Sequence, residues 1–390
     1  MVNLFDLSLE ELSGFVCSLG EKPFRARQIY GWMYGKGVTD FSAMTDVPAA
    51  ARGRLQAAAA LEVLRPAGAV ASADGGTTKL LFETGDGECI EAVFMRYKDR
   101  NSTCISTQAG CRMGCRFCAS GALGLARNLS PGEMALQVVL AERACGARTK
   151  NIVLMGIGEP LDNYDSVRKF IENITDDHGR DLSRRAITLS TCGVVPMIDR
   201  LAAELPQVNL AVSLHAPDDV LRGQIMPVTK RWGVREVVAA AARHVEATHR
   251  RATFEYALIE GFNDAPAQAN ALAALLRGLN CLVNLIPLNT AGTGGMPCTV
   301  GADGNPPDTN GARYAGTGTA AAQRFREALG ARGVKATVRR SLGADIEAAC
   351  GQLRLRRRKA GASRPAEGAC DGAERDAASF GHDGSEVLNG

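Results

Sequence analysis

Three cysteines lie within eight residues in the stretch CRMGCRFC, from Cys111 to Cys118. Cys115 stands between the outer two, so the spacing is C-x3-C-x2-C. Three thiolates this close together are typical of a metal or cluster site, because thiolates are strong ligands for zinc and iron. No fourth ligand is evident nearby in the sequence. We therefore expect the bound group to keep one coordination position open.

The missing fourth ligand bears on the kind of metal centre. A structural zinc site normally has four protein ligands in paired C-x2-4-C spacings, and no partner C-x2-C stands elsewhere in the chain. Three thiolates on a cubane [4Fe-4S] cluster would leave one iron free to chelate S-adenosylmethionine, whose reductive cleavage gives a 5′-deoxyadenosyl radical. The spacing, with Phe117 before the third cysteine, resembles the signature of the radical SAM superfamily.

A glycine-rich stretch supports the same chemistry. GIGEP, from Gly156 to Pro160, follows a predicted strand and offers free backbone groups and a carboxylate. Radical SAM proteins use a stretch of this kind to hold the methionine amino group. Many loops look like GxGEP, so its position one strand–helix unit after the cysteines is what makes it informative.

The elements that must position these residues alternate between strand and helix. Helical periodicity is clear in PGEMALQVVLAERA and VREVVAAAARHVEA, and short apolar segments on either side predict strands. Repeated β-then-α units imply parallel strands and a full or partial barrel, with the chemistry at the carboxyl ends of the strands. The predicted strands are TCIST from 103, NIVLMG from 151, AITLST from 186, NLAVSLH from 209, TFEYALIE from 253, LVNLIPLN from 282 and KATVRR from 335.

The remaining segments suggest how the chain is divided. Residues 1–75 predict a small helical domain, and residues 76–354 predict the barrel, preceded by a β-hairpin in TKLLFETGDGECIEAVFMRY. Residues 291–319 are dense in Gly, Pro, Thr and Asn, which predicts a flexible insertion. Residues 355–390 predict a tail that is first basic and then disordered.

Composition is ordinary for a soluble enzyme, with 46% hydrophobic and 22% charged residues among 390. No apolar run could span a bilayer, and the acidic start MVNLFDLSLEEL differs from a signal peptide. We expect a cytoplasmic protein with no membrane partner. Twelve cysteines without a secretory signal then favour reduced thiols, metal ligands or catalysis over disulfides. The net charge of +3 is too small to indicate nucleic acid by itself.

Together these motifs resemble the bacterial dual-specificity adenine-C2 methyltransferases of the RlmN type, over nearly all of residues 3–354. The resemblance implies an α/β fold, a radical SAM partial (β/α) barrel with a small N-terminal helical domain. It implies methylation of C2 of a specific adenine in the peptidyl-transferase centre of 23S rRNA and in the anticodon loop of tRNA. The motifs that carry it are NLFDLSLEEL, GEKPFRARQIYGWMY, CISTQAGCRMGCRFCAS, MGIGEPLDNYD, ITLSTCGVVP, LAVSLHAP, NLIPLN and RRSLGADIEAACGQL.

The resemblance also gives roles to two further cysteines and a carboxylate. In the family's scheme one S-adenosylmethionine methylates Cys350 and a second is cleaved, so that a radical on the methyl carbon adds to C2. Glu91 accepts the C2 proton. Cys104 then attacks the sulfur of Cys350, which releases methylated RNA and leaves a disulfide to be reduced. From the residues alone, Glu91 could equally be a surface carboxylate of a strand.

The expected cofactors are a [4Fe-4S] cluster on Cys111, Cys115 and Cys118 and two S-adenosylmethionine molecules per turnover. Expected partners are 23S rRNA, tRNA and an electron donor such as flavodoxin or ferredoxin, with the protein a monomer. Strand-end capping is the other interpretation of the polar cosubstrate residues. By resemblance the cosubstrate residues are Gly158, Glu159, Ser190, Ser213, Leu214, His215 and Asn289.

Basic residues that could meet the RNA backbone lie in three places. Lys22, Arg25 and Arg27 share one helical segment, Arg339 and Arg340 precede the catalytic tail, and RLRRRK covers 354–359. Each could equally be a solvated surface.

Three other functions remain open from the sequence. Methylation of adenine C8, as in ribosomal antibiotic resistance, uses the same motifs and cysteines. A non-catalytic RNA-binding protein with a structural metal would need a fourth ligand. A methylthiotransferase would need three more cysteines ahead of the first set, and the sequence has none there. The sequence departs from the family after Asn289, where the insertion begins, and beyond about residue 360.

Overall fold

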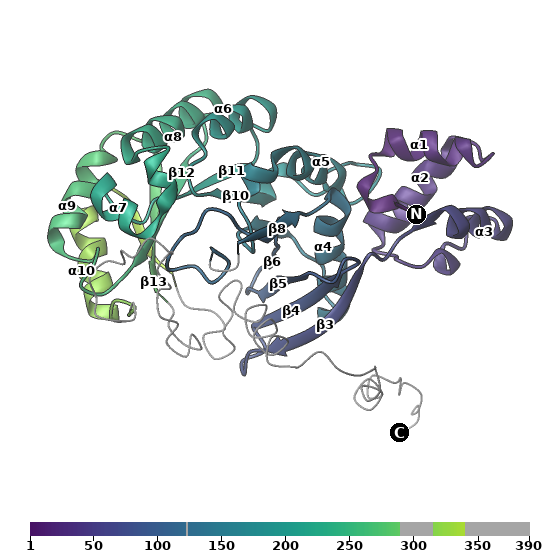
Figure 1. Cartoon of the computed structure of the whole chain (residues 1–390), viewed down its shortest axis with the longest axis horizontal. Coiled ribbons are helices and arrows are strands. Elements are labelled where there is room, and N and C mark those ends of the chain that lie inside the picture. The colour runs from purple at the N-terminus through teal and green to yellow at the C-terminus, as the bar shows by residue number, and fades with distance from the viewer. Residues whose placement is uncertain (122–123, 289–314, 340–390) are drawn as a thin grey trace, which may run out of the picture. The chain divides into compact units, whose positions relative to one another are not determined.

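The computed structural model describes residues 1–121, 124–288 and 315–339. Ten strands in these residues form one curved sheet (Figure 1), in the order β14-β13-β12-β11-β10-β9-β6-β5-β4-β3. β3 to β6 pair antiparallel, and β6 and β9 to β14 pair parallel. The strands are β3 (Leu64–Ala71), β4 (Thr77–Thr84), β5 (Cys89–Arg96), β6 (Asn101–Cys104), β9 (Asn151–Leu154), β10 (Ile187–Thr191), β11 (Asn209–Ser213), β12 (Ala252–Leu258), β13 (Cys281–Pro287) and β14 (Ala336–Val338).

A helix follows each of the parallel strands β6 and β9 to β13 and connects it to the next strand of the sheet. These helices lie along the outer side of the sheet (Figure 1). Short α7 (Asp219–Ile225) adds to the connection between β11 and β12. The crossing helices are α4 (Pro131–Cys145), α5 (Tyr164–Ile174), α6 (Val195–Glu204), α8 (Val234–Thr248), α9 (Pro266–Leu275) and α10 (Thr319–Gly330).

The two faces of the parallel sheet differ in polarity because side chains alternate along each strand. In β10, Ile187 and Leu189 are buried in the core with the helices, while Thr188 and Ser190 face the other way and stay half-exposed. Residues paired across the neighbouring strands share this second face. One row contains Ser190, Ala211 and Thr253, and another contains Ser213, Glu255 and Asn284. A closed, packed barrel has an apolar interior. This polar inner face instead suits a bound substrate.

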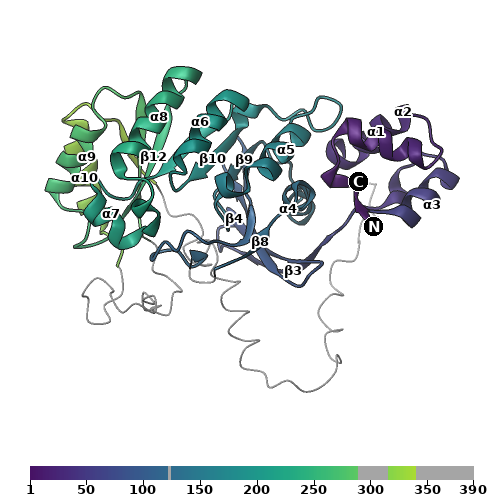
Figure 2. The same cartoon turned by 45° about the horizontal axis from the view of Figure 1, so that its top comes forward.

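The N-terminal residues form α1 (Leu9–Ser18), α2 (Phe24–Tyr30) with a π-helical turn at Gly31–Gly35, and α3 (Ala49–Ala58). A short parallel pair, β1 (Val2–Asn3) with β2 (Ala59–Ala60), closes this part. Figure 2 shows its helices α1, α2 and α3 grouped together. This part is tied to the crossing helices by direct bonds. The Tyr30 hydroxyl donates to the Asn173 carbonyl over 3.0 Å, and the Gly132 amide donates to Asp6 over 2.7 Å.

All seven predicted barrel strands and the hairpin, β4 with β5, are present. The structure adds an edge strand, β3, that the sequence did not indicate. LRPAGAVA contains Pro66 and Gly68, which suit an edge or a bulge, and the pairing with β4 does shift register between them. Of the predicted insertion, residues 315–319 are described, and Gly316 already pairs with Ile259 while α10 begins at Thr319. Across the described ranges, each helix is too short or too polar to cross a bilayer.

Candidate active site

The cysteine loop leaves the sheet between two short paired strands, β7 (Gln108–Gly110) and β8 (Leu125–Asn128). Cys111, Cys115 and Cys118 are all half-buried in this loop. The Cys111 amide donates to the Gly124 carbonyl and joins the two ends of the loop, and the Arg116 amide, in its middle, donates to the Ile225 carbonyl of α7. The sequence motif thus becomes a fixed cradle at one end of the sheet.

The donor set fits an iron–sulfur cluster better than a single ion. A structural zinc normally has four protein ligands, whereas this loop offers three thiolates. In a [4Fe-4S] cluster each thiolate binds a different iron, so three thiolates leave one iron open. The Ser120 hydroxyl, also in the loop, is buried with no hydrogen-bond partner among the described residues, which fits a group still to be bound.

The thiols need a positive group to ionise. Burial raises the pKa of Cys111 to about 12, and repulsion from Cys118 and Glu159 adds to the effect. Burial likewise raises the pKa of Cys115, with further repulsion from the other two cysteines. Iron binding would reverse this preference, since a coordinating thiol is deprotonated outright. The site is therefore chemically matched to a cationic cluster.

The GIGEP loop follows β9 and lies directly against the strand that leads into the cysteine loop. The Gln108 amide donates to the Ile157 carbonyl over 3.1 Å, and the Gly156 amide donates to Ile105 over 3.0 Å. A Cβ at Gly156 would lie 2.6 Å from the Ile105 backbone, and one at Gly158, whose φ is +113°, would lie 2.7 Å from Gln108. Both glycines are thus required by close approach rather than by flexibility.

Glu159 holds the end of this loop. Its carboxylate accepts hydrogen bonds from the Leu161 amide over 3.0 Å and the Cys192 amide over 2.7 Å. Burial raises the pKa of Glu159, and these two backbone bonds oppose the rise. The carboxylate therefore joins the GIGEP loop to the carboxyl end of β10. Glu159 therefore shapes the loop, a structural role that the sequence motif did not indicate.

A polar bridge fixes the cysteine loop against the GIGEP loop. Asp162 accepts hydrogen bonds from Arg112 Nε over 2.8 Å and from Gln108 Nε2 over 2.9 Å. Gln108 Oε1 in turn accepts from the Glu159 amide over 2.9 Å. The two loops that the sequence analysis assigned to cluster and cosubstrate are therefore held by one network.

His215 follows the end of β11 and lies beside the cysteine loop. It has φ of +57°, and its ring lies 4.9 Å from that of Phe117 in an edge-on contact. Nδ1 accepts from the Ala257 amide over 2.9 Å, so a neutral ring carries its proton on Nε2. Burial and then repulsion from Arg222 lower the pKa of His215 to about 3. Leu214, next to it, is fully buried and packs in the core.

Arg222 of α7 is a residue that sequence reasoning missed. Its side chain is fully buried, and it donates to the carbonyls of Cys192, Ser213 and Leu214. It thereby fixes the carboxyl ends of β10 and β11, next to Ser190 and Ser213 themselves. An arginine in the segment DVLRGQI carries no motif, so only its burial in the fold reveals the role.

Cys104 and Glu91 lie on neighbouring strands. Cys104 ends β6 and pairs with Val93 of β5, two residues from Glu91. Because alternate residues of a strand share a face, Glu91, Val93 and Cys104 all point to the inner face. The Glu91 and Cys104 side chains are both buried, with 3% and 8% exposed. Glu91 is thus not a surface carboxylate, and its Oε2 lies 2.9 Å from Nζ of Lys79.

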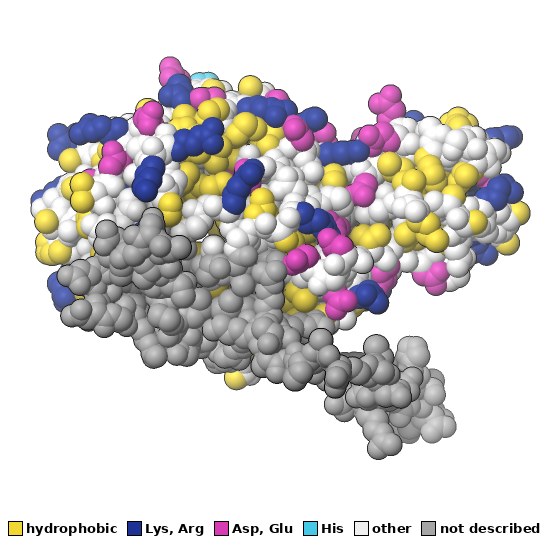
Figure 3. All heavy atoms as spheres, in the orientation of Figure 1, with side chains coloured by type: hydrophobic (Ala, Val, Ile, Leu, Met, Phe, Trp, Pro, Cys, Tyr) yellow, Lys and Arg dark blue, Asp and Glu magenta, His cyan; other side chains and the backbone are white. Residues whose placement is uncertain are grey.

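Two of the expected residues, Asn289 and Cys350, lie outside the described residues, as do Arg340 and the basic run 354–359. Of the N-terminal basic group, Lys22 and Arg27 are exposed, while Arg25 is hydrogen-bonded to Gln28 over 2.6 Å. On the described part of the face in Figure 3, Lys and Arg side chains are scattered among acidic and apolar ones. That scatter agrees with the small net charge.

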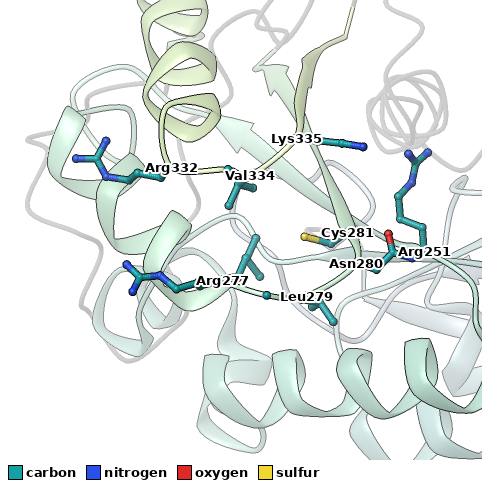
Figure 4. A pocket seen from close by; sticks show the side chains of 11 residues that line it. Arg251, Arg277, Leu279, Asn280, Cys281, Arg332, Val334 and Lys335 are labelled. Atoms are coloured by element: carbon teal, nitrogen blue, oxygen red, sulfur yellow. The ribbon is translucent and has the colours of Figure 1, made fainter.

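A pocket of ≈ 330 Å³ lies elsewhere, at the amino ends of β13 and β14. Figure 4 shows Arg277 and Arg332 pointing to one side of it, away from Arg251 and Lys335. All four are exposed. Because the amino ends of parallel strands lie opposite the carboxyl ends, this pocket is separate from the cysteine loop and the GIGEP loop.

Two family models match this chain, one over the N-terminal helices and one over part of the sheet. Residues 2–61 match the family model "Ribosomal RNA large subunit methyltransferase N-terminal domain", and residues 105–271 match "Radical SAM superfamily". The second match spans the cysteine loop, the GIGEP loop and β10 to β12. Residues 64–104, with β3 to β6, fall between the two matches.

Curated relatives match over nearly the whole chain. A "Probable dual-specificity RNA methyltransferase RlmN" of Desulforamulus reducens is 45% identical, covering 91% of this chain and 96% of the relative. One of Symbiobacterium thermophilum is 46% identical over 90% of each. The crystal structure of a radical SAM methyltransferase from Sphaerobacter thermophilus superposes with a TM-score of 0.82 at 45% identity, covering 90% of this chain and 99% of that one.

Proposed function

This chain belongs to the family of dual-specificity RNA methyltransferases named RlmN, and from that premise we propose that it methylates C2 of a specific adenine in 23S rRNA and in tRNA. It is a radical SAM methyltransferase that depends on S-adenosylmethionine and a [4Fe-4S] cluster. The peptidyl-transferase centre and the tRNA anticodon loop are the proposed target sites.

We assign the cluster to Cys111, Cys115 and Cys118, and the cosubstrate to Gly158, Glu159, Ser190, Ser213, Leu214, His215 and Asn289. When bound, the cluster supplies the electron that cleaves S-adenosylmethionine to a 5′-deoxyadenosyl radical. The described residues orient that chemistry: Asp162 joins the two loops through Arg112 and Gln108, and Arg222 fixes the ends of β10 and β11. His215 stays neutral at physiological pH, so it acts as a hydrogen-bonding group rather than a cation.

One observation carries the catalytic assignment: Glu91 and Cys104 share the inner face on adjacent strands. A C2 proton acceptor and a resolving thiol must both reach the same adduct, so they must lie close together. Their burial keeps water from the adduct. We assign Glu91 as the proton acceptor and Cys104 as the thiol that attacks the sulfur of Cys350, which carries the methyl group.

We also propose the setting in which this enzyme works. The helical residues 1–75 would contact RNA, with exposed Lys22 and Arg27 meeting the phosphate backbone. The electron donor would be a flavodoxin or a ferredoxin. The protein would act as a monomer in the cytoplasm, where the disulfide formed in each turnover can be reduced.

The experiment is anaerobic reconstitution with iron and sulfide, followed by reaction with S-adenosylmethionine, a reductant and protein-free ribosomal RNA. Nucleosides are then compared with 2-methyladenosine and 8-methyladenosine by mass spectrometry. We expect 2-methyladenosine from the wild-type protein and none from Cys350→Ala.

Cys281→Ala serves as the matched control, because Cys281 is buried at the opposite end of the sheet and has no assigned role. It should retain methylation. Formation of 8-methyladenosine instead would refute the C2 assignment, and a fully loaded protein that methylates no adenosine would refute the proposed function.

A further inference from the structure

Lys79 of β4 is completely buried, with 0% of its side chain exposed. Lysine is among the residues least often found fully buried, and when it is, it is paired. Here Nζ lies 2.9 Å from Oε2 of Glu91, whose side chain is only 3% exposed. Neither the motifs nor the family match at residues 105–271 draws attention to this lysine.

The strand register places Lys79 and Glu91 on the inner face of the sheet, together with Cys104. Lys79 lies opposite Val93 of β5, and Val93 lies opposite Cys104 of β6. Lys79, Glu91 and Cys104 therefore share one face across three adjacent strands. The other face of these strands, with Leu80 and Phe94, belongs to the main core against α4.

The Lys79–Glu91 pair lies beside a cluster of apolar side chains. Cys104 packs with Val93 and Met95, and with Val153 and Met155 from the β9 side, so this part of the inner face is apolar. An ion in such a place is costly unless it is paired and hydrogen-bonded. A buried ion pair is also weak evidence for stability, because well-packed apolar residues often serve as well. A role beyond stability is therefore the better account of this pair.

We propose that Lys79 is a positioning residue for proton removal from the RNA adduct. Its Nζ, 2.9 Å from Oε2 of Glu91, holds that carboxyl group in place along the face shared with Cys104. In the step concerned, the C2–H bond of the adduct breaks, the proton forms an O–H bond on Glu91, and the electron pair remains with the adduct. This inference rests on the proposed function, since it needs the covalent protein–RNA intermediate.

The test uses the full-length protein with its cluster loaded and compares Lys79→Met with Lys79→Arg. Methionine is similar in length but lacks the charge, while arginine keeps the charge. Three quantities are measured separately: methyl transfer to Cys350 by protein mass spectrometry, covalent protein–RNA adduct on denaturing gels, and release of methyladenosine.

We expect Lys79→Met to methylate Cys350 as fast as wild type, to accumulate adduct and to release methyladenosine at least about tenfold more slowly, because Glu91 is no longer held in position to accept the proton. Lys79→Arg should recover much of the release rate. Lys79→Gln provides a second uncharged variant in case Lys79→Met does not fold.

Arg180→Met is the matched control, because Arg180 forms a buried ion pair with Glu142 away from this face. It should lower the melting temperature without accumulating adduct. The proposal is overturned if either uncharged variant releases product at the wild-type rate, or if it loses every step in parallel as a purely structural lesion would. Wild-type protein that forms neither adduct nor methyladenosine would instead overturn the proposed function.

Discussion

The role of a side chain in this enzyme depends on its burial and its partner as much as on the motif that contains it. Glu91 and Glu159 are both buried carboxylates, yet one is paired with Lys79 and the other with two backbone amides. The first arrangement places a carboxyl group beside Cys104 on the inner face, and the second fastens the GIGEP loop to the end of β10. Residue type alone does not distinguish these roles, because the partner decides what a buried carboxylate can do.

The Lys79–Glu91 pair predicts a non-additive stability pattern. Lys79→Met or Glu91→Gln alone leaves one buried charge without its partner and should cost about 3–5 kcal/mol of unfolding free energy. The double variant removes both charges and should be clearly more stable than either single variant. Urea unfolding of all four proteins measures the coupling, and simple additivity would contradict the pairing.

The buried histidines predict a loss of stability in mild acid. Burial lowers the pKa of His215 to about 3 and that of His244 to about 4, from about 6.5. Both sites therefore favour the neutral ring, so this contribution is fully present above pH 6.5 and is lost as pH falls toward 4. The slope should approach about 1.4 kcal/mol per pH unit for each histidine.

Urea unfolding of the cluster-free protein between pH 7.5 and 4.5 checks this slope. His244→Phe, an apolar ring of similar shape at a site with no assigned function, should flatten the slope by about half. An unchanged slope in that variant would show that other groups govern the acid sensitivity.

At the scale of elements, the cysteine loop and the GIGEP loop are held together by close backbone approach in addition to the side-chain hydrogen bonds of Asp162. The GIGEP loop lies so close to the strand before the cysteine loop that Gly156 and Gly158 have no room for a Cβ. Each loop therefore limits the movement of the other, which couples the cluster ligands to the proposed cosubstrate segment.

Gly158→Ala tests this coupling. Its φ of +113° is unfavourable for alanine, and the new Cβ would lie 2.7 Å from Gln108, so the loop must move. We expect S-adenosylmethionine binding to weaken by at least about tenfold, from a strain of order 1–3 kcal/mol. Equilibrium binding measures this. Gly53→Ala, at an open helical position in α3, should bind normally, and equal affinity in the two variants would refute the steric argument.

At the scale of the whole described molecule, direct hydrogen bonds join the N-terminal helices to the helices that cover the sheet. Asn173 of α5 is central to the join. Its side chain donates to the Leu7 carbonyl over 3.2 Å and lies 3.3 Å from the Tyr34 hydroxyl, and its own carbonyl accepts from Tyr30.

Asn173→Ala should therefore loosen the N-terminal part selectively. Losing buried hydrogen bonds at this join should cost about 1–3 kcal/mol, and amide exchange in α1 to α3 should speed up more than exchange in β10 to β12. Asn209→Ala, which removes side-chain bonds to the Arg185 and Ile187 carbonyls within the sheet, is the matched control. Uniform acceleration of exchange in Asn173→Ala would contradict a local join.

The sequence by itself determined the chemistry and the order of the strands. The spacing Cys111, Cys115, Cys118 and the period of the apolar segments are local properties, so they can be recognised without a fold. The edge strand β3 was not predicted from the sequence, because Pro66, Gly68 and its small side chains are not typical of a strand.

Only the tertiary structure decided which residues meet across the sheet. Three contacts illustrate this: Lys79 pairs with Glu91, the buried Arg222 donates to the Cys192 carbonyl, and the Cys192 amide donates to Glu159. These partners lie 12 to 33 positions apart in the sequence. Such contacts depend on strand register and helix packing, and neither is encoded in a short motif. The motifs thus indicate the class of reaction, while the tertiary structure decides which side chains lie around the site.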